Sequence, residues 1–359
     1  MSGLPLEYPV LSPPEVGGAV PLYPGVLWLR LPVPGSLRHI NVWLLDEGPG
    51  WTLVDTGMDV PEARTAWEGP LAAVLAGRPL LRIVCTHHHP DHAGLAAWLA
   101  ARHGAPVWMS AKEERLLRVL LDSTGDPAAQ QARIAAFEAE GLVATEALRP
   151  MMAVAGYGKV MSGIPADIRP LGEGDVLTIG AIRWVVRIAR GHTDGQVLLH
   201  APAEGLLIAG DQVLPRITSN IGIYPEREDL DPLGSFLASL ESLALLDPEP
   251  LVLPSHGDVF RGLRRRVAVL QEHHAVTLER LSAAAVAGSA SAVDFAAVLF
   301  RAGLDPLNRI LAHGETLAHL YYLVVRGRLA VTSGPGQVRR YGARVIPEPT
   351  RPGAILADL

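Results

Sequence analysis

The sequence predicts an α/β protein whose core is a four-layer αββα sandwich, followed by a C-terminal helical, winged-helix-like appendage. Short strand-like segments near the N-terminus lead into helix-like segments, the same pattern returns from Leu177 onward, and the C-terminal part reads as helices followed by two short strands. With 359 residues, 49% of them hydrophobic, the chain is long enough to bury such a core. We expect an extended arm (1–20), a sandwich domain (21–260) with a helical insertion or lid (111–165), and the appendage (261–359).

The first half of the sandwich is predicted from short apolar segments separated by turn residues such as Pro34-Gly35 and Gly48-Pro49-Gly50. The expected elements are strands at 26–33, 39–46, 51–55 and 80–85, helices at 61–75 and 93–102, and a helical stretch at 111–149. The segment 151–165 is apolar and interrupted by glycine, and together with 213–224 it is expected to shape a substrate pocket.

The second half repeats this order. The expected elements are strands at 182–188, 196–200, 205–208 and 251–253, a helix at 232–246, helical segments from 262 to about 325, and strands at 328–332 and 337–341. The last two strands flank Gly334-Pro335-Gly336 and would form a small wing.

Composition narrows the class of protein. No stretch approaches 18 uninterrupted apolar residues, so we expect no membrane-spanning helix and no membrane partner. The N-terminus lacks a basic segment followed by an apolar one, which favours a cytoplasmic protein. Cys85 is the only cysteine, so any metal site must use histidine and carboxylate ligands. The net charge is −6, but residues 261–359 hold 13 basic and 7 acidic residues, which leaves an anionic ligand or nucleic acid open for that region.

The most informative segment is the loop that joins the predicted strand at 80–85 to the next helix. It places four candidate ligands within six residues, namely His87, His89, Asp91 and His92. In an extended loop His87 and His89 project to the same side, because side chains alternate, whereas His88 should point away. One loop can therefore supply ligands to two adjacent metal ions.

Three further candidates follow later strands. His192, Asp211 and His256 each come directly after an apolar segment and are flanked by glycine or small residues. This is where a sheet presents side chains at its edge and where glycine lets the backbone pass close to an ion. The four strand ends are expected to point to one place.

In these motifs the sequence resembles the metallo-β-lactamase superfamily over roughly residues 20–260. The HxHxDH signature corresponds to residues 87–92, and the later motifs appear in order as GHTDG, AGDQ and PSHGD, after an early Asp-Thr-Gly at Asp55. The resemblance implies one metal held by His87, His89 and His192, a second held by Asp91, His92 and His256, and Asp211 bridging both. The glutamate that replaces one histidine in the flavodiiron branch is absent.

The donor set suits two Zn²⁺ ions, with Fe²⁺ or Mn²⁺ as alternatives. Two such ions lower the pKa of a shared water to about 7, which would supply a metal-bridging hydroxide for hydrolysis. Asp91 is expected to orient that water and carry its proton, and Asp55 to hold a ligand or its loop in place. Tyr224 is a candidate hydrogen-bond donor to the substrate, against the simpler interpretation of a packing tyrosine.

The expected substrate is a small carboxylic ester, thioester or lactone. The best-known zinc β-lactamases of the superfamily have Cys or Ser where Asp211 stands, so β-lactam hydrolysis is expected only as a weak activity. The tail, which includes Glu315 to Leu320, resembles the winged-helix end of the β-lactamase-like 2 subgroup, and that subgroup includes an endoribonuclease. The alternative is therefore a phosphodiesterase or endoribonuclease in which Arg261 and Arg264 to Arg266 hold phosphates.

The remaining polar residues of the tail have plainer interpretations. Three of the arginines, Arg264 to Arg266, are more typical of a solvated helix face than of a phosphate site. His273, His274, His313 and His319 are likewise expected on solvated helix faces. A third, non-enzymatic interpretation makes the tail a DNA-binding or dimerising module, and the apolar tail helices make a homodimer plausible.

Overall fold

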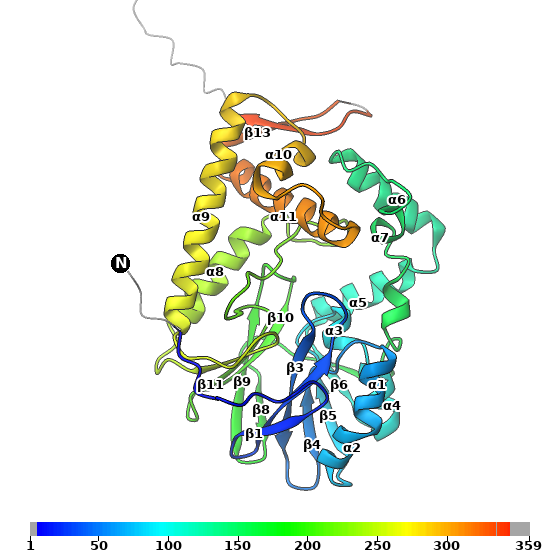
Figure 1. Ribbon diagram of the computed structural model, residues 1–359, viewed down its shortest axis with the longest axis vertical. Helices are drawn as coiled ribbons and strands as arrows, with labels where there is room; N and C mark the ends of the chain where they lie inside the picture. The colour runs from blue at the N-terminus through cyan, green and yellow to red at the C-terminus, as the bar shows by residue number, and fades with distance from the viewer. Residues whose placement is uncertain (1–5, 335, 345–359) are drawn as a thin grey trace, which may run out of the picture.

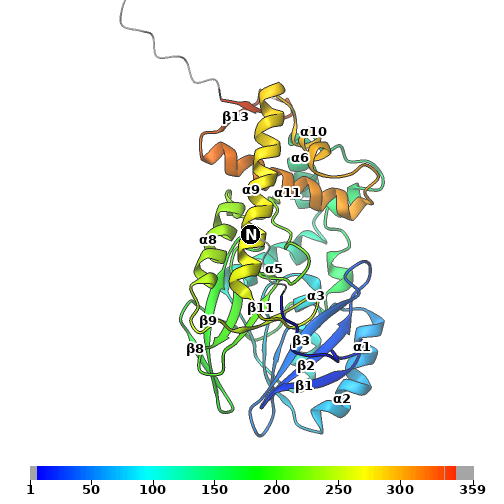
Figure 2. The ribbon, with the colours of Figure 1, turned by 60° about the vertical axis from the view of Figure 1, so that its left-hand side comes forward.

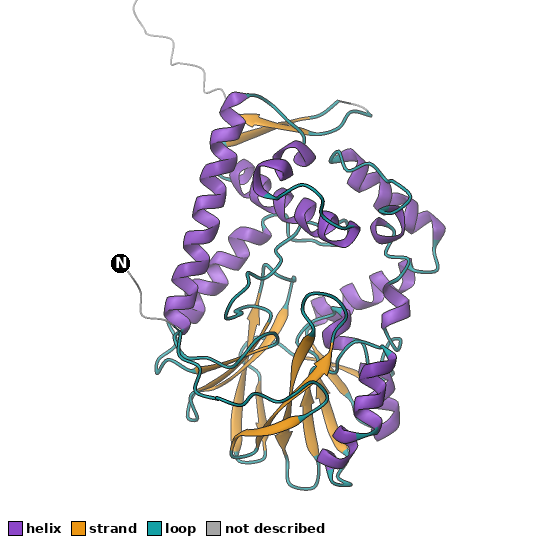
Figure 3. Ribbon diagram, in the orientation of Figure 1, coloured by secondary structure: helices purple, strands orange, loops and turns teal. Residues whose placement is uncertain are grey.

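The computed structural model describes residues 6–334 and 336–344, and it contains two β-sheets that lie face to face (Figures 1 and 3). Helices cover the outer face of each sheet, so the predicted αββα sandwich is confirmed. A buried apolar cluster fills the space between the sheets, with Trp28 and Trp43 contributed by one sheet and Trp184 and Val186 by the other. Each of these four side chains is at most 1% exposed, so the two sheets share one continuous core.

The first sheet has seven strands in sequential order. They are β1 (Ala19–Tyr23), β2 (Val26–Pro32), β3 (His39–Asp46), β4 (Trp51–Val54), β5 (Leu80–Val84), β6 (Val107–Met109) and β7 (Ile168–Pro170). Neighbours from β1 to β4 are antiparallel, and those from β4 to β7 are parallel. The parallel strands β4 and β5 therefore end at the same edge of the sheet.

Helices α1 (Pro61–Glu68), α2 (Pro70–Leu75) and α4 (Ala96–His103) pack on the outer face of the first sheet. The single helix predicted at 61–75 is wrong, because the chain breaks at Gly69. Pro70 has no N–H to donate to the preceding turn, and its ring would clash with a carbonyl there, so a new helix begins at this residue.

The second sheet has five strands in the order β12-β11-β10-β9-β8. They are β8 (Val176–Ile179), β9 (Ile182–Ala189), β10 (Gln196–Ala201), β11 (Leu206–Gly210) and β12 (Leu251–Pro254). Only β11 and β12 are parallel, so their carboxyl ends also meet at one edge. Helix α8 (Pro232–Ala244) packs on the outer face through Phe236 and Leu240.

The insertion between β6 and β7 is helical only in part. It contains α5 (Ala111–Ser123), α6 (Pro127–Ala139), α7 (Arg149–Met152) and the 3-10 turn η1 (Tyr157–Val160). The stretch predicted to be helical to residue 149 therefore stops at Ala139. Phe137 and Met152 of the insertion belong to one buried cluster with Ile310 of the C-terminal region. This cluster ties the insertion to the appendage, and a lid function for the insertion stays a prediction.

The C-terminal region consists of three helices followed by a two-stranded antiparallel sheet, as Figure 2 shows beside the sandwich. Its elements are α9 (Leu263–Ala287), α10 (Ala292–Leu299), α11 (Pro306–Val325), β13 (Leu329–Thr332) and β14 (Arg340–Ala343). The predicted order of helices and strands is present, but the second strand begins three residues later and ends two residues later than predicted. In the part of the chain that the structure describes, every helix is too short or too polar to cross a membrane.

Three histidines predicted on solvated helix faces are buried instead. His274, His313 and His319 are at most 1% exposed, and only His273 lies on the surface. Helices α8, α9 and α11 pack against one another and cover His274 and His319. His313 is covered from the side of the insertion, where its ring centroid lies 6.0 Å from that of Phe137 of α6. His319 Nδ1 donates to Glu315 O at 2.8 Å, and its Nε2 lies 3.1 Å from His274 Nδ1, which must therefore be the donor of that bond.

This buried pair should make the protein less stable in acid. Burial lowers the pKa of His274 to about 3 and that of His319 to about 4, whereas both titrate near 6.5 when unfolded. The unfolded chain thus binds more protons below pH 6.5, and stability falls as the pH drops from 6.5 towards 4. The variant His274→Asn keeps a donor towards His319 but does not titrate. When the pH is lowered from 7.5 to 5, we expect its free energy of unfolding to fall by roughly 2 kcal/mol less than that of the wild type.

Urea denaturation at the two pH values, on metal-depleted protein, measures this difference. Metal depletion removes the contribution of metal release, and His273→Asn on the exposed face is the matched control. An acid loss that is identical in wild type and His274→Asn would contradict the assignment of a neutral buried pair.

Candidate metal centre

The loop after β5 places its histidines at the edge of the first sheet. β5 ends at Val84, and Pro90 begins the short helix α3 (Pro90–Ala93), because its fixed φ angle suits the first helical position. Between these points the chain is extended at His89, and His87 Nε2 lies 2.9 Å from His89 Nδ1. As predicted, His88 points away from them, and its Nδ1 lies 2.6 Å from a carboxylate oxygen of Glu113.

The second sheet supplies His192 to the same place. His192 Nε2 lies 3.2 Å from His87 Nε2 and 3.1 Å from His89 Nδ1. Three imidazole nitrogens thus lie within 3.2 Å of one another, and in this set His87 and His192 are buried. Mutual repulsion of their lone pairs is relieved when a cation lies between them, and the set has the composition of a metal site.

A second group lies beside the first. Asp91 Oδ2 is 3.3 Å from His256 Nε2 and 3.7 Å from His92 Nε2. Asp211 lies between the two groups, with Oδ2 3.4 Å from His192 Nε2 and Oδ1 3.5 Å from the Nε2 atoms of both His92 and His256. The seven residues selected from the sequence are therefore brought together, and one carboxylate faces both groups.

The buried polar atoms of the second group support divalent metal binding. His92 Nε2, His256 Nε2 and Asp211 Oδ1 are buried and have no hydrogen-bond partner among the described residues. Buried polar atoms are ordinarily paired, so three unpaired acceptors that converge on one point indicate a ligand there. The donor set of imidazole and carboxylate is that of Zn²⁺, Fe²⁺ or Mn²⁺ sites.

The opposite ring nitrogen of several histidines is held by an oxygen. His92 Nδ1 lies 2.8 Å from Asp55 Oδ2, His192 Nδ1 lies 2.7 Å from Asn220 O, and His256 Nδ1 lies 2.8 Å from His39 O. Because a carbonyl oxygen can only accept, the last two bonds place the proton on Nδ1 and leave Nε2 as a lone-pair donor for a metal. Asp55 Oδ1 also accepts from the backbone N of Thr86 at 2.7 Å, so the structure places Asp55 where the sequence predicted a supporting carboxylate.

The electrostatics distinguish the two groups of histidines. Burial and the surrounding imidazoles lower the pKa of His87 and His89 well below the ordinary value. Burial opposes the charged form of His92 and His256, but nearby carboxylates, above all Asp55 for His92 and Asp211 for His256, outweigh it and raise the pKa of both rings. Burial opposes ionisation of Asp211, but His92 and His256 outweigh it and hold the pKa of this carboxyl below its usual range. Neutral imidazole and ionised carboxylate are the forms that bind metal ions.

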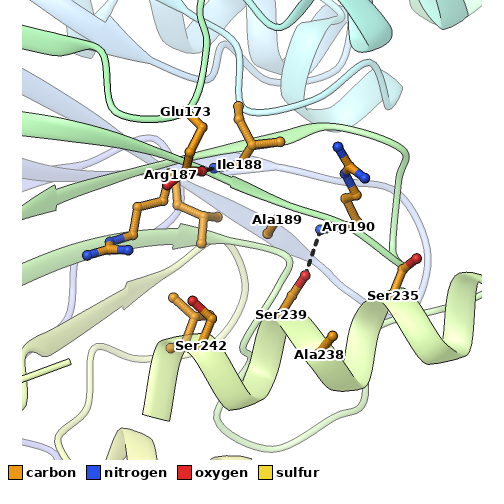
Figure 4. A pocket seen from close by; sticks show the side chains of 11 residues that line it. Glu173, Arg187, Ile188, Ala189, Arg190, Ser235, Ala238, Ser239 and Ser242 are labelled. Atoms are coloured by element: carbon orange, nitrogen blue, oxygen red, sulfur yellow. Dashed lines mark hydrogen bonds between the residues drawn. The ribbon is translucent and has the colours of Figure 1, made fainter. Parts of the chain in front are cut away.

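The backbone before His192 is fixed by α8. Arg190 N donates to Ser239 Oγ at 3.0 Å, as Figure 4 shows in the groove between β9 and α8. Gly191 follows with a φ of +110°, and a Cβ at this position would lie 2.3 Å from Cβ of Phe236. Only glycine permits this approach and this conformation, which explains the glycine before the histidine.

Two further elements of the site carried no recognised signal in the sequence. Arg227 is almost fully buried, donates from Nε to Asp194 Oδ1 at 2.8 Å, and from Nη1 to the carbonyls of Gly191, His192 and Gly222 at 2.8–3.2 Å. It thereby holds the loop of a candidate ligand. Asp194 lies within the GHTDG motif and was visible there, whereas nothing near Arg227 in the sequence indicated this role.

Glu113 is the second such element. This fully buried carboxylate accepts from His88 N at 3.1 Å through Oε2 and from Gly195 N at 2.8 Å through Oε1, so one side chain joins the two ligand loops. Ser110, three residues earlier, caps α5 by accepting from Glu113 N, and its hydroxyl donates to Gly195 O at 2.6 Å. The spacing Ser-x-x-Glu is typical of a helix start, so nothing in the sequence indicated a contact between Glu113 and Gly195.

Tyr224 lies next to the site, but its hydroxyl is already used. It donates to Asn220 Oδ1 at 2.7 Å, and the same asparagine accepts from His192 through its backbone oxygen. The aromatic ring packs against Gly314 of α11, where a Cβ would come within 2.7 Å of it. Donation to a substrate would therefore require Tyr224 to exchange its bond with Asn220.

Comparison with known proteins agrees with this geometry. The family profile described as Metallo-beta-lactamase superfamily matches residues 35–256, and the profile Metallo-beta-lactamase-like, C-terminal domain matches residues 278–344. A crystal structure of a beta-lactamase domain protein from Burkholderia ambifaria is 36% identical and has a TM-score of 0.86, covering 94% of this chain and 98% of that one. A metallo-beta-lactamase family protein from Thermus thermophilus is 30% identical, with a TM-score of 0.78, covering 90% of this chain and 99% of that one.

Two curated relatives are named for their activity. The probable metallo-hydrolase YqjP of Bacillus subtilis (strain 168) is 27% identical over 253 residues, which cover 65% of this chain and 72% of that protein. The hydroxyacylglutathione hydrolase of Fuscovulum blasticum is 27% identical over 241 residues, which cover 67% of this chain and 70% of that protein.

Proposed function

Since the chain belongs to the metallo-beta-lactamase superfamily and is a metallo-hydrolase, we propose that it hydrolyses a small carboxylic ester, thioester or lactone with two divalent ions. The observation that carries this proposal is the position of Asp211, whose two carboxylate oxygens face different groups of histidines. A bridging carboxylate is an arrangement that serves two ions rather than one.

The proposed ligands divide into two sets that share one residue. His87, His89 and His192 would hold the first ion, Asp91, His92 and His256 would hold the second, and Asp211 would serve both. Zn²⁺ is the proposed metal, because catalytic zinc sites are commonly built from imidazole and carboxylate ligands. When bound, such a pair lowers the pKa of a water and polarises the oxygen of a substrate carbonyl.

The residues around the site have distinct proposed tasks. Asp91 lies at the turn into α3 with a side chain 13% exposed, and we assign it the orientation of the attacking water and the acceptance of its proton. Asp55 holds His92, and Asn220 holds His192, so that both rings keep their direction. Tyr224 positions Asn220, and a contact of Tyr224 with the substrate stays a prediction.

A thioester is the favoured member of the proposed substrate class. Hydroxyacylglutathione, named as the substrate of several relatives, is an acyl thioester, and these relatives match this chain over more than half its length. Thioesters, esters and lactones present the same reacting carbonyl carbon. Weak β-lactam hydrolysis also stays a prediction.

The alternative of a phosphodiester substrate receives no support from two of its arginines. Arg266 is buried and donates to Leu214 O and Ile217 O, each at 2.6 Å. Arg264 donates to Ala244 O at 3.0 Å and Leu246 O at 2.8 Å, at the end of α8. The expectation that both belong to a solvated helix face is wrong for Arg266, because it fastens the loop after β11.

A panel of substrates tests the proposal. Protein of known metal content is assayed with a phenyl ester, an acyl thioester, an aliphatic lactone, a β-lactam and a bis-aryl phosphodiester, with and without a chelator. We expect chelator-sensitive turnover of the carbonyl substrates, fastest with the thioester. Dominant turnover of the phosphodiester would overturn the proposed substrate class. Arg264→Gln is the matched control and should leave thioester turnover unchanged.

A further inference from the structure

A cavity of about 360 Å³ lies between the loop that follows α6 in the insertion and the C-terminal helices. Its walls are mainly apolar, formed by Leu142 after α6, Val293 and Ala296 of α10, Phe300 after α10, and Ala312 of α11. The residues lining this cavity include none of the proposed metal ligands. It is therefore a different site from the metal centre.

One polar side chain of the lining is buried without a partner. His313 of α11 is 1% exposed, and both of its ring nitrogens lack a hydrogen-bond partner among the described residues. Burial lowers the pKa of His313 to about 4, so the ring is neutral at pH 7 and offers one donor and one acceptor. A buried imidazole without hydrogen-bond partners destabilises the folded protein unless a ligand or water supplies them.

Two exposed cations line the same cavity. Arg301 and Arg309 are exposed, and among the hydrogen bonds and ion pairs of the described residues neither guanidinium takes part. The nearest acidic residue along the chain, Asp305, instead caps α11 by accepting from Asn308 N at 3.0 Å. The exposed part of the lining is therefore positively charged, whereas the walls are apolar and the interior has a single polar group.

We propose that this cavity binds a small amphipathic carboxylate, with its anionic head at Arg301 and Arg309 and its hydrocarbon chain along the apolar walls. A hydroxyl or carbonyl at the other end of the ligand bonds to His313, whose ring turns to present a nitrogen to the cavity, because both nitrogens are buried in this structure. The volume holds about a dozen non-hydrogen atoms at roughly 30 Å³ each. Guanidinium groups recognise carboxylates through two parallel hydrogen bonds, which sets the expected head group. An eight-carbon hydroxy acid has the required size and chemistry.

Calorimetric titration with three probes of equal chain length tests this proposal on the full chain. The probes are 8-hydroxyoctanoate, octanoate and 1-octanol. We expect 8-hydroxyoctanoate to bind most tightly, octanoate next, and octanol about tenfold more weakly than octanoate, because it lacks the charge. Octanol binding as tightly as octanoate, or no saturable binding of either acid at millimolar concentration, would overturn the proposal.

Two sets of variants test the contacts of the ligand's carboxylate end and of its hydroxyl end separately. Arg301→Gln with Arg309→Gln should weaken both acids about tenfold or more, and the exposed Arg183→Gln on β9 is the matched control. His313→Leu should remove the preference for the hydroxy acid and retain octanoate binding, which also shows that the variant is folded. Equal loss of both acids in folded His313→Leu would contradict the assigned orientation.

Repeating the titration with metal-depleted protein distinguishes this site from the metal centre. We expect unchanged affinity, whatever the outcome of the substrate panel. Loss of carboxylate binding with the metal would place the probe on the metal ions and would overturn the proposal for this cavity.

Discussion

Asp211→Ala is expected to lose at least one metal ion per chain and to lower kcat/KM about a thousandfold or more. Among the described residues this carboxylate alone faces both histidine groups, with oxygens 3.4 Å from His192 and 3.5 Å from His92 and His256. Its removal would take a negative charge from between the two proposed ions and a ligand from each. A loss of about 4 kcal/mol of transition-state stabilisation corresponds to this thousandfold decrease.

Metal analysis by mass spectrometry and steady-state kinetics on the same preparation measure both quantities. Asp122→Ala, an exposed aspartate on α5, is the matched control and should retain wild-type metal content and activity. Two tightly bound ions together with near wild-type kcat/KM in Asp211→Ala would contradict the bridging role.

Glu113→Gln is expected to lower metal affinity or kcat about 10- to 100-fold, the usual effect of removing a group that supports metal ligands. The carboxylate accepts from the backbone nitrogens of His88 and Gly195 and from the His88 ring. An amide has one acceptor oxygen, so its NH₂ group would face a donor that it cannot bond. The loops that carry His87, His89 and His192 would then lose their common anchor.

Competition with a chromogenic chelator gives the metal affinity, and kinetics give the division between kcat and KM. A positioning role predicts weaker metal binding and lower kcat with KM nearly unchanged. The neighbouring Glu114→Gln, which removes only a surface pair with Arg118, is the control. If Glu113→Gln loses thermal stability but keeps its metal affinity and kcat, the role of Glu113 is to stabilise the fold and not to position the metal ligands.

The candidate ligands were predictable because each of them lies shortly after a strand. His192, Asp211 and His256 lie directly after apolar segments of the second sheet, and the sheet topology brings their strand ends to one edge. The spacing within residues 87–92 added the ligands from the first sheet. The local sequence therefore indicated which residues lie at the strand ends, because a strand and the loop after it are continuous in the chain.

The supporting contacts were not predictable because they join distant segments. Glu113 meets a backbone group 82 residues away, at Gly195, and its sequence neighbours suggest only a helix start. The short strands β6 and β7 have three residues each, too few for an alternating pattern. They form because β5 provides an edge for β6, and β6 provides one for β7. His274 and His319 are buried by helices that are distant in the sequence, so the residues around each histidine do not indicate its burial.

Titration of metal-depleted protein with Zn²⁺, followed by both bound metal and thioester hydrolysis, tests the central claim most directly. The proposed site predicts that activity is negligible without metal, rises with added Zn²⁺ and saturates at two ions per chain. Full activity with one ion per chain, or hydrolysis that persists after the metal is removed, would contradict a hydrolase whose two ions share Asp211.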